Sequence, residues 1–207
     1  MYARVVRVRG SAEGAEERTA TFQREALPVI REQPGFAGVV TLGDPGSGVG
    51  AVVTYWESEE AMTASAEVLA ALRERMTAGQ GLEVLSTEQY EINMLERRAA
   101  PVPGNAVRVT RANGNLDTAE TALAQLRGEG LALASTLPGF RALISGIDRS
   151  SGRFMIASGW NTAADRDASE PATAALRARL AEVAGATNLE VDKLEVTLAE
   201  VPAGIRS

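Results

Sequence analysis

The chain has 207 residues, of which 45% are hydrophobic and 23% are charged. This length accommodates one or two domains, and the composition is ordinary for a globular protein that buries a core. The chain contains no cysteine and no histidine. Their absence excludes disulfides, thiolate and imidazole catalysis, and zinc sites built from those residues. A metal could be held only by carboxylates and carbonyls. We expect no metal site and no cofactor.

The formal net charge is -6, and the basic residues do not cluster along the chain. A nucleic-acid partner requires a basic face, so none is expected. The longest apolar run, residues 49–56, is far shorter than the roughly 20 residues of a membrane helix. The first ten residues alternate like a strand and do not resemble a signal peptide. The sequence predicts a cytoplasmic protein without a membrane partner.

The first quarter of the chain predicts a strand followed by a helix. Residues 2–9 alternate and contain β-branched side chains, which is typical of a strand. From Ser11 or Ala12 to Gln33 apolar residues recur near helical spacing, and Pro28 should kink this helix or separate its last turn.

Two strands, a helix and a long strand should follow. Residues 36–42 and 49–56 predict strands joined by a glycine-rich turn. Ser58 can begin a second helix that ends at residues 79–81. Residues 82–95 predict the fourth strand.

The same pattern then occurs a second time. Pro34-Gly35-Phe36 returns as Pro138-Gly139-Phe140, and Trp56 returns as Trp160. Both recurrences are separated by 104 residues, the difference between positions 36 and 140. The same offset matches Arg4 with Arg108, Arg7 with Arg111, Leu72-Arg73 with Leu176-Arg177, and Glu91 with Glu195. Such a fixed offset indicates an internal duplication.

The duplication predicts the domains and the fold class. Residues 1–97 form the first repeat, 98–105 a linker with two prolines and one glycine, and 106–207 the second repeat, whose helices cover 116–136 and 162–182. Each repeat has the β-α-β-β-α-β order of a ferredoxin-like unit, so the class is α+β. The third strand of each repeat is apolar on both faces, which indicates burial on both faces. We expect the two units to pack sheet to sheet as one intrachain α/β barrel.

Two motifs carry a resemblance to a known family. Pro-Gly-Phe begins the second strand, and Trp-Glu-Ser-Glu-Glu-Ala (residues 56–61) joins the third strand to a helix. Both resemble the antibiotic-biosynthesis-monooxygenase-like proteins of the dimeric α/β barrel superfamily, which are usually single domains that dimerise through their sheets. The resemblance implies that this chain is a fused pair of such domains, present as a monomeric pseudo-dimer or as a homodimer of chains.

The superfamily includes cofactor-independent oxygenases, haem-degrading enzymes and members without known activity. Haem-degrading members use an Asn on the first strand, a Trp that ends the third strand, and a His. Trp56 and Trp160 match that Trp, but the first strands contain Arg7 and Arg111 instead of Asn, and no His exists. Anthrone-oxidising members carry an Asn on the strand that bears the Trp, and neither repeat has one there. The resemblance therefore implies neither of these two mechanisms.

Trp56 and Trp160 are candidate substrate-binding residues. An indole can form the wall of a site for a flat aromatic ligand, and its N–H can donate a hydrogen bond. The alternative is a core aromatic that packs a helix against the sheet. Tyr55 and Asn93 are further candidates for contact with a substrate, and Asn93 is matched by Thr197 in the second repeat.

Arg7 and Arg111 lie among apolar residues on the first strand of each repeat, where a guanidinium requires a carboxylate partner. Glu91 and Glu195 on the fourth strands are candidate partners. The alternatives are a structural ion pair and an anion clamp in which Arg111 binds substrate. In the second case Arg7 and Glu91 are the catalytic candidates: Arg7 stabilises a phenolate, and the base is Glu91, Tyr55 or solvent.

The sequence favours a cofactor-independent monooxygenase that acts on a small electron-rich aromatic or quinol-type compound. The alternative is a non-catalytic member that binds a small molecule or a protein. An open apolar cavity with an unpaired Arg or Asn at its wall would favour the enzyme. A sealed interior, with Arg7 paired to Glu91, would favour the alternative.

Overall fold

The computed structural model describes residues 1–201, and it divides into two compact units. The first unit contains residues 1–91 together with the segment that begins at Leu194, and the second contains residues 92–193. The two long strands β4 (Glu83–Arg97) and β8 (Thr187–Glu200) therefore each contribute to both units. The compact units thus differ from the repeats in the sequence by these strand segments.

The first unit begins with a strand and has the predicted order of elements. After β1 it contains two groups of helical segments, with two strands between the groups. The segments that precede β4 are β1 (Tyr2–Arg9), α1 (Ala15–Thr21), η1 (Phe22–Ala26), α2 (Leu27–Arg31), β2 (Phe36–Gly43), β3 (Val49–Trp56), α3 (Glu59–Ala64) and α4 (Ala66–Gln80).

The second unit repeats this order. Its segments before β8 are β5 (Ala106–Asn113), α5 (Leu116–Gln125), η2 (Leu126–Gly130), α6 (Leu131–Thr136), β6 (Phe140–Asp148), β7 (Arg153–Trp160), α7 (Ala163–Ala168) and α8 (Glu170–Val183).

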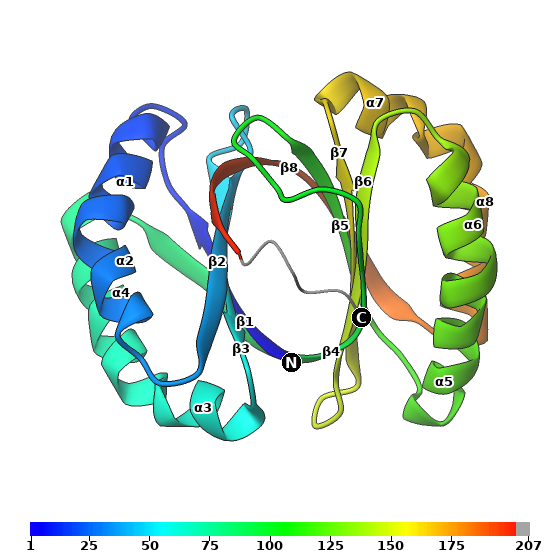
Figure 1. The fold of residues 1–207 in the computed structure, drawn as a ribbon, viewed down its shortest axis with the longest axis horizontal. Coiled ribbons are helices and arrows are strands. Elements are labelled where there is room, and N and C mark those ends of the chain that lie inside the picture. Colours follow the sequence, from blue (N-terminus) through cyan, green and yellow to red (C-terminus); the bar gives the residue numbers. More distant parts are fainter. Residues whose placement is uncertain (202–207) are drawn as a thin grey trace. The chain divides into compact units, whose positions relative to one another are not determined.

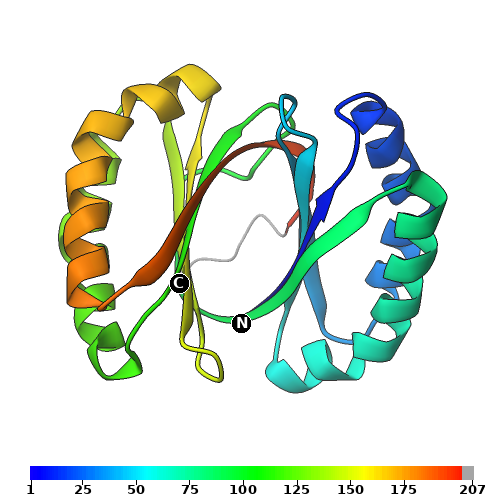
Figure 2. The same cartoon turned by 180° about the vertical axis from the view of Figure 1, so that it is seen from behind.

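Each unit has a sheet with its helices on one face (Figures 1 and 2). The strand order is β4-β1-β3-β2-β8 in the first unit and β8-β5-β7-β6-β4 in the second. Because β4 and β8 occur in both orders, the series of hydrogen-bonded strands is closed, as the barrel prediction requires. The predicted α+β class with two ferredoxin-like units is confirmed.

The core of each unit lies between the helices and the helix-facing side of the sheet. In the first unit Trp56 lies among Ala26, Ile30, Met62, Leu69 and Leu72. In the second, Trp160 lies among Leu123, Leu126, Phe140, Leu176 and Leu180. Both indoles are fully buried, so each forms the centre of its unit's apolar core.

The predicted first helix is interrupted by a π-helical turn, η1, which ends two residues before Pro28. The second unit has the turn η2 at the matching position, where Ala132 replaces the proline. A proline removes a helical hydrogen bond and favours such an irregularity. Because the turn forms in both units, however, it does not depend on Pro28.

Pro28→Ala is therefore expected to leave the far-UV circular dichroism spectrum unchanged. The free energy of unfolding should fall by about 0.5–1 kcal/mol, because the unfolded chain gains conformational freedom without its proline. Urea unfolding of both proteins measures this difference. A loss of helical signal in the variant would contradict the inference that the π-helical turn forms without Pro28.

In the part of the chain that the structure describes, no helix is both long enough and apolar enough to cross a lipid bilayer. Within residues 1–201 there is also no group of three or more acidic side chains that could hold a metal ion.

Candidate functional site

The first unit contains a cavity of about 700 Å³ between its helices and its sheet. Segments α1, η1 and α4 form one wall, and strands β1, β2, β3 and β8 form the other. Most of the lining is apolar and includes Val6, Phe22, Val52, Leu69, Leu72 and Met76. This volume and this lining are typical of a site for a small organic molecule.

Two glycines on neighbouring strands leave space for the cavity. Gly43 of β2 pairs with Gly50 of β3, and both line the cavity. The matching pair in the second unit is Ile147 of β6 and Phe154 of β7. The two units have the same strand register here. The first unit lacks the two side chains at Gly43 and Gly50, and this leaves space for the cavity between its sheet and its helices.

Arg4 of β1 provides a buried positive charge at the cavity wall. Its Nη1 donates to Ser65 Oγ at 3.0 Å and its Nη2 donates to the Met62 carbonyl at 2.5 Å. The guanidinium also lies over the Trp56 ring, 5.7 Å from the ring centroid, at a distance suitable for a cation–π contact. These contacts hold the charge in a fixed position.

The contact with Met62 explains why the predicted second helix is broken. The sequence predicted one helix from Ser58, but the structure has α3 and α4 with Ser65 between them. Arg4 binds the Met62 carbonyl, and Ser65 Oγ donates to the same carbonyl at 2.7 Å. Helix ends need such partners for their free carbonyls.

Arg73 of α4 lines the same cavity and is partly exposed. Burial lowers the pKa of Arg4, and the positive charge of Arg73 lowers it further. Within residues 1–201, neither arginine forms an ion pair with a carboxylate. Arg4 and Arg73 are therefore two neighbouring cationic side chains that repel each other, and Arg18 of α1 is a third arginine in the cavity wall.

A pair of hydroxyl groups lies in the part of the wall that β2 and β8 form. Thr41 Oγ1 of β2 and Thr197 Oγ1 of β8 are 2.6 Å apart, and both residues line the cavity. Each hydroxyl can also accept or donate a further hydrogen bond. These hydroxyls can orient a hydroxyl or carbonyl group of a ligand.

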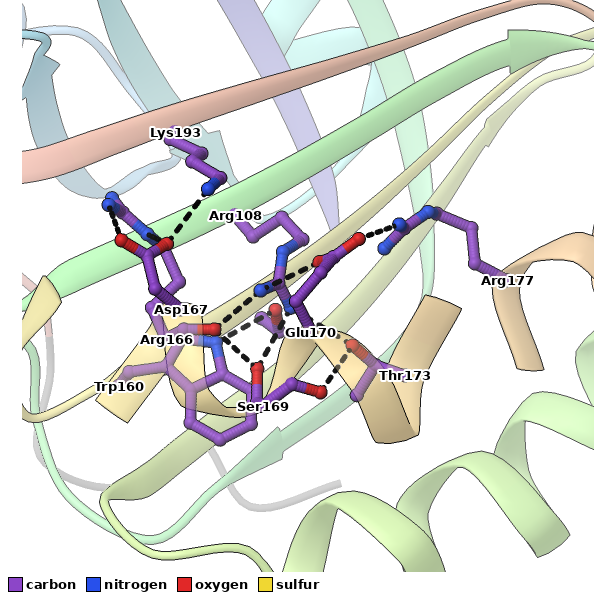
Figure 3. Close-up of polar contacts among 10 residues, drawn as sticks. Arg108, Trp160, Arg166, Asp167, Ser169, Glu170, Thr173, Arg177 and Lys193 are labelled. Atoms are coloured by element: carbon purple, nitrogen blue, oxygen red, sulfur yellow. Dashed lines mark hydrogen bonds and ion pairs between the residues drawn. The ribbon is translucent and has the colours of Figure 1, made fainter. Parts of the chain in front are cut away.

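The second unit has the same arginines with a different environment (Figure 3). Arg108 matches Arg4, and Arg177 matches Arg73. Between them lies Glu170, whose Oε2 is 3.0 Å from Arg108 Nη2 and whose other oxygen accepts a hydrogen bond from Arg177. Ala66 occupies the matching position in the first unit. The carboxylate that balances the arginine pair is thus present only in the second unit.

The pKa of Glu170 reflects this contact. Burial acts to raise it, whereas the hydrogen bond from Arg177 and the charge of Arg108 lower it, and the net direction is down. In the folded protein Glu170 is therefore more easily ionised than a free glutamate.

The two predicted tryptophans end the third strand of each unit at matching positions. Trp56 Nε1 donates to Thr54 Oγ1 and Trp160 Nε1 donates to Ser158 Oγ, both at 3.1 Å. Trp56 is not among the residues that line the cavity; it underlies Arg4, which does.

Arg7 and Glu91 are not brought together by the strand register. Arg7 of β1 pairs with Ser86 of β4, whereas Glu91 of β4 pairs with Tyr2 of β1. Arg7 and Glu91 are therefore offset by five residues along the strands, and their side chains point to opposite faces of the sheet. The predicted pairing between them is therefore wrong, because the first and fourth strands are antiparallel with a register that the sequence did not reveal.

Arg111 has a carboxylate partner, but not the predicted Glu195. Its Nη2 is 2.5 Å from Asp192 and 3.3 Å from Glu190, both on β8. Glu195 instead pairs with Gly43 of β2 and lines the cavity of the first unit. The position of the structural ion pair was thus missed by three residues.

The remaining two candidates lie outside the cavity wall. Tyr55 of β3 is buried and pairs with Ala3, on the face opposite to Arg4. Asn93 lies in the second unit, where its backbone carbonyl accepts a hydrogen bond from Arg127 and its side-chain oxygen has no partner.

Sequence reasoning did not identify Arg4 and Arg73 as site residues. A signal for them existed, because both arginines recur in the second repeat while the glutamate between their partners does not. Alternation along β1 also places Arg4 on the face opposite to Arg7.

Comparisons with known proteins agree with this architecture. Residues 1–72 match the family model "Antibiotic biosynthesis monooxygenase". The chain is 25% identical over 201 residues to the uncharacterized protein Rv2557 of Mycobacterium tuberculosis (strain H37Rv), and the match covers 97% of this chain and 89% of that protein.

Two solved structures share the fold. An anthrone oxidase-like protein has a TM-score of 0.69 with 16% identity, and the match covers 97% of this chain and 93% of the other. A candidate monooxygenase of Fusobacterium nucleatum has a TM-score of 0.70 with 8% identity over 99% and 95% of the two chains. The resemblance predicted from the sequence is thereby confirmed: residues 1–72 match the antibiotic biosynthesis monooxygenase family model, and the chain shares the fold of monooxygenase-like proteins along nearly its whole length.

Proposed function

We propose that the first unit is a cofactor-independent monooxygenase site for a small electron-rich aromatic or quinol-type compound. The observation that carries the proposal is the cavity of about 700 Å³, which has apolar walls and a buried arginine. A cavity of this size accommodates a compound of two or three fused rings. The match of residues 1–72 to a monooxygenase family supports the choice of reaction.

The chemistry suits a chain without histidine and cysteine. An electron-rich aromatic compound can itself supply the electrons that reduce dioxygen. One oxygen atom then enters the substrate, and the other leaves as water with two hydrogens from the substrate. The protein has to exclude bulk water, orient the ring and stabilise the substrate anion. The apolar walls perform the first two tasks, and the positive charge of Arg4 performs the third.

Oxygen uptake by the purified, metal-free protein tests this function. Anthrones, quinols and dihydroxynaphthoates are the compounds to use. The informative variant is Gly43→Ile, which places in the cavity wall the side chain that Ile147 supplies in the second unit. A β-carbon at Gly43 meets only a methyl group of Thr197 at 3.4 Å, so the strand can accept it. We expect uptake above the uncatalysed rate to fall at least tenfold in this variant.

The control is Gly79→Ile, which adds the same side chain on α4, where no atom lies within 4 Å of the new β-carbon. It should retain the uptake of the unmodified protein. Equal uptake by Gly43→Ile would contradict the assignment of the reaction to this cavity. If the compounds bind without any uptake, the protein is a small-molecule-binding member of the superfamily and the oxygenase is refuted.

A further inference from the structure

One difference between the repeats removes a carboxylate from the arginine pair of the first unit. Arg4 and Arg73 of the first unit match Arg108 and Arg177 of the second, but Glu170 is replaced by Ala66. Burying a positive charge without a partner is unfavourable, and two neighbouring positive charges add to the cost. The first unit therefore retains a cationic pair that its own residues do not neutralise.

The second unit shows what such a pair binds. The carboxylate of Glu170 bridges the two guanidinium groups, with one oxygen toward Arg108 and the other toward Arg177 (Figure 3). A planar carboxylate fits guanidinium donors well, and each such bond is stronger than a neutral hydrogen bond. Glu170 thus marks the place of an anionic group relative to the two arginines.

The first unit holds its buried arginine in the same geometry. Arg4 donates to Ser65 Oγ at 3.0 Å and to the Met62 carbonyl at 2.5 Å. Arg108 donates to Ser169 Oγ and to the Arg166 carbonyl at the same two distances. These contacts leave the guanidinium in the matching orientation, while the short side chain of Ala66 cannot reach it.

The cavity reaches this arginine pair. Arg4 and Arg73 both line it, and so do the carboxylate-bearing residues Glu16, Asp44 and Glu195. None of these three carboxylates forms an ion pair with Arg4 or Arg73 in the part of the chain that the structure describes. A ligand in the cavity can therefore bring the negative charge that the protein lacks there.

We propose that the ligand of the first unit is an aromatic carboxylate, whose carboxylate lies between Arg4 and Arg73 where Glu170 lies in the second unit. Its ring system extends along the apolar walls toward Gly43 and Gly50. The proposal rests on the proposed function only in using the same cavity, and it specifies the substrate class as an aromatic acid. Binding can be measured without oxygen turnover, so the two claims are separable.

Isothermal titration calorimetry with 3-hydroxy-2-naphthoate and 2-naphthol tests the proposal. The two probes share a ring system and a hydroxyl, and only the first carries a carboxylate. We expect the naphthoate to bind the unmodified protein at least tenfold more tightly than the naphthol. Equal affinities for the two probes would refute the anion site and leave the cavity itself in place.

Ala66→Glu gives the most direct variant, because it copies Glu170 into the first unit. The new carboxylate should bridge Arg4 and Arg73 and compete with the naphthoate. Its control is Ala66→Gln, which fills the same space without charge. We expect the naphthoate affinity of Ala66→Glu to be at least tenfold below that of Ala66→Gln, with little difference for 2-naphthol. Similar naphthoate affinities in these two variants would overturn the proposal.

A second matched pair of substitutions removes the less buried arginine of the pair in each unit. Arg73→Gln should weaken naphthoate binding at least fivefold, whereas Arg177→Gln in the second unit should leave it unchanged. Equal effects of the two substitutions would contradict a site in the first unit. If the naphthoate binds as expected but no compound drives oxygen uptake, the anion site stands and the oxygenase fails. If neutral quinols drive oxygen uptake but the protein binds the naphthoate no more tightly than 2-naphthol, the oxygenase stands and the anion site fails.

Discussion

Trp56→Ala is expected to lower the free energy of unfolding by about 3–5 kcal/mol, the usual range for removing a large aromatic side chain from a core. The indole is fully buried and contacts Phe36 edge to face, with ring centroids 6.0 Å apart. It also supports the guanidinium of Arg4 and donates to Thr54. Alanine leaves a cavity and removes all three contacts, so the loss should lie at the upper end for a single substitution.

Urea unfolding followed by circular dichroism measures this loss. Trp160→Ala should behave alike, since that indole contacts Phe140 at 5.7 Å and donates to Ser158. Val68→Ala on the exposed surface of α4 is the control and should change stability by less than about 0.5 kcal/mol. A loss below about 1 kcal/mol in Trp56→Ala would show that the indole is not a core residue.

Arg108→Met is expected to lower the free energy of unfolding by about 2–4 kcal/mol, although methionine has a similar length and is apolar. The arginine is 3% exposed and donates to Ser169, Thr173 and the Arg166 carbonyl. A hydrogen bond from a charged donor contributes about 1.5–3 kcal/mol, and the contributions of several such bonds from one side chain do not add fully. Their loss leaves buried acceptors with fewer donors.

The pH dependence of this effect has a defined sign. The pKa of Glu170 is lowered in the folded protein, so its ion pair stabilises the fold above the unfolded pKa of about 4.5. That stabilisation disappears as the pH falls through the lower folded pKa. The difference in unfolding free energy between the unmodified protein and Arg108→Met should therefore narrow when urea unfolding is repeated at decreasing pH below 4.5.

Arg4→Met provides the matched comparison in the first unit. It removes equivalent hydrogen bonds to Ser65 and Met62, but it also relieves the repulsion from Arg73. Its loss should be smaller than that of Arg108→Met, and it should show no narrowing at low pH. The opposite order of the two losses would contradict the charge difference between the units.

Much of the fold followed from the duplication in the sequence. The fixed offset, the alternating strands and the Pro-Gly-Phe signals determine the order of elements in both units. The second helix of each repeat was predicted as continuous because its apolar spacing is continuous. The interruptions at Ser65 and Ser169 depend on arginines from another element that bind free carbonyls, and apolar spacing carries no sign of such contacts.

The cavity was harder to predict, because missing side chains create it. The sequence predicted Gly43 in a turn and Gly50 in the strand that follows, whereas the structure pairs the two glycines across β2 and β3. Their meaning depends on the register, which places Ile147 and Phe154 at the same pair in the other unit. Likewise, Ala66 is uninformative alone and acquires meaning only when Glu170 is seen to bridge two arginines.

The pairing of β2 with β8 has a consequence for the synthesis of the protein. Val40 pairs with Ala199, and the cavity wall joins Thr41 to Thr197. A ribosome synthesises the β8 part of this wall long after the rest of it. While residues 194–200 are still inside the exit tunnel, the first unit lacks an edge strand and part of its cavity wall. A nascent chain that already contains β1 to α4 therefore cannot present the finished cavity to a ligand, and ligand binding can stabilise the first unit only after β8 has emerged.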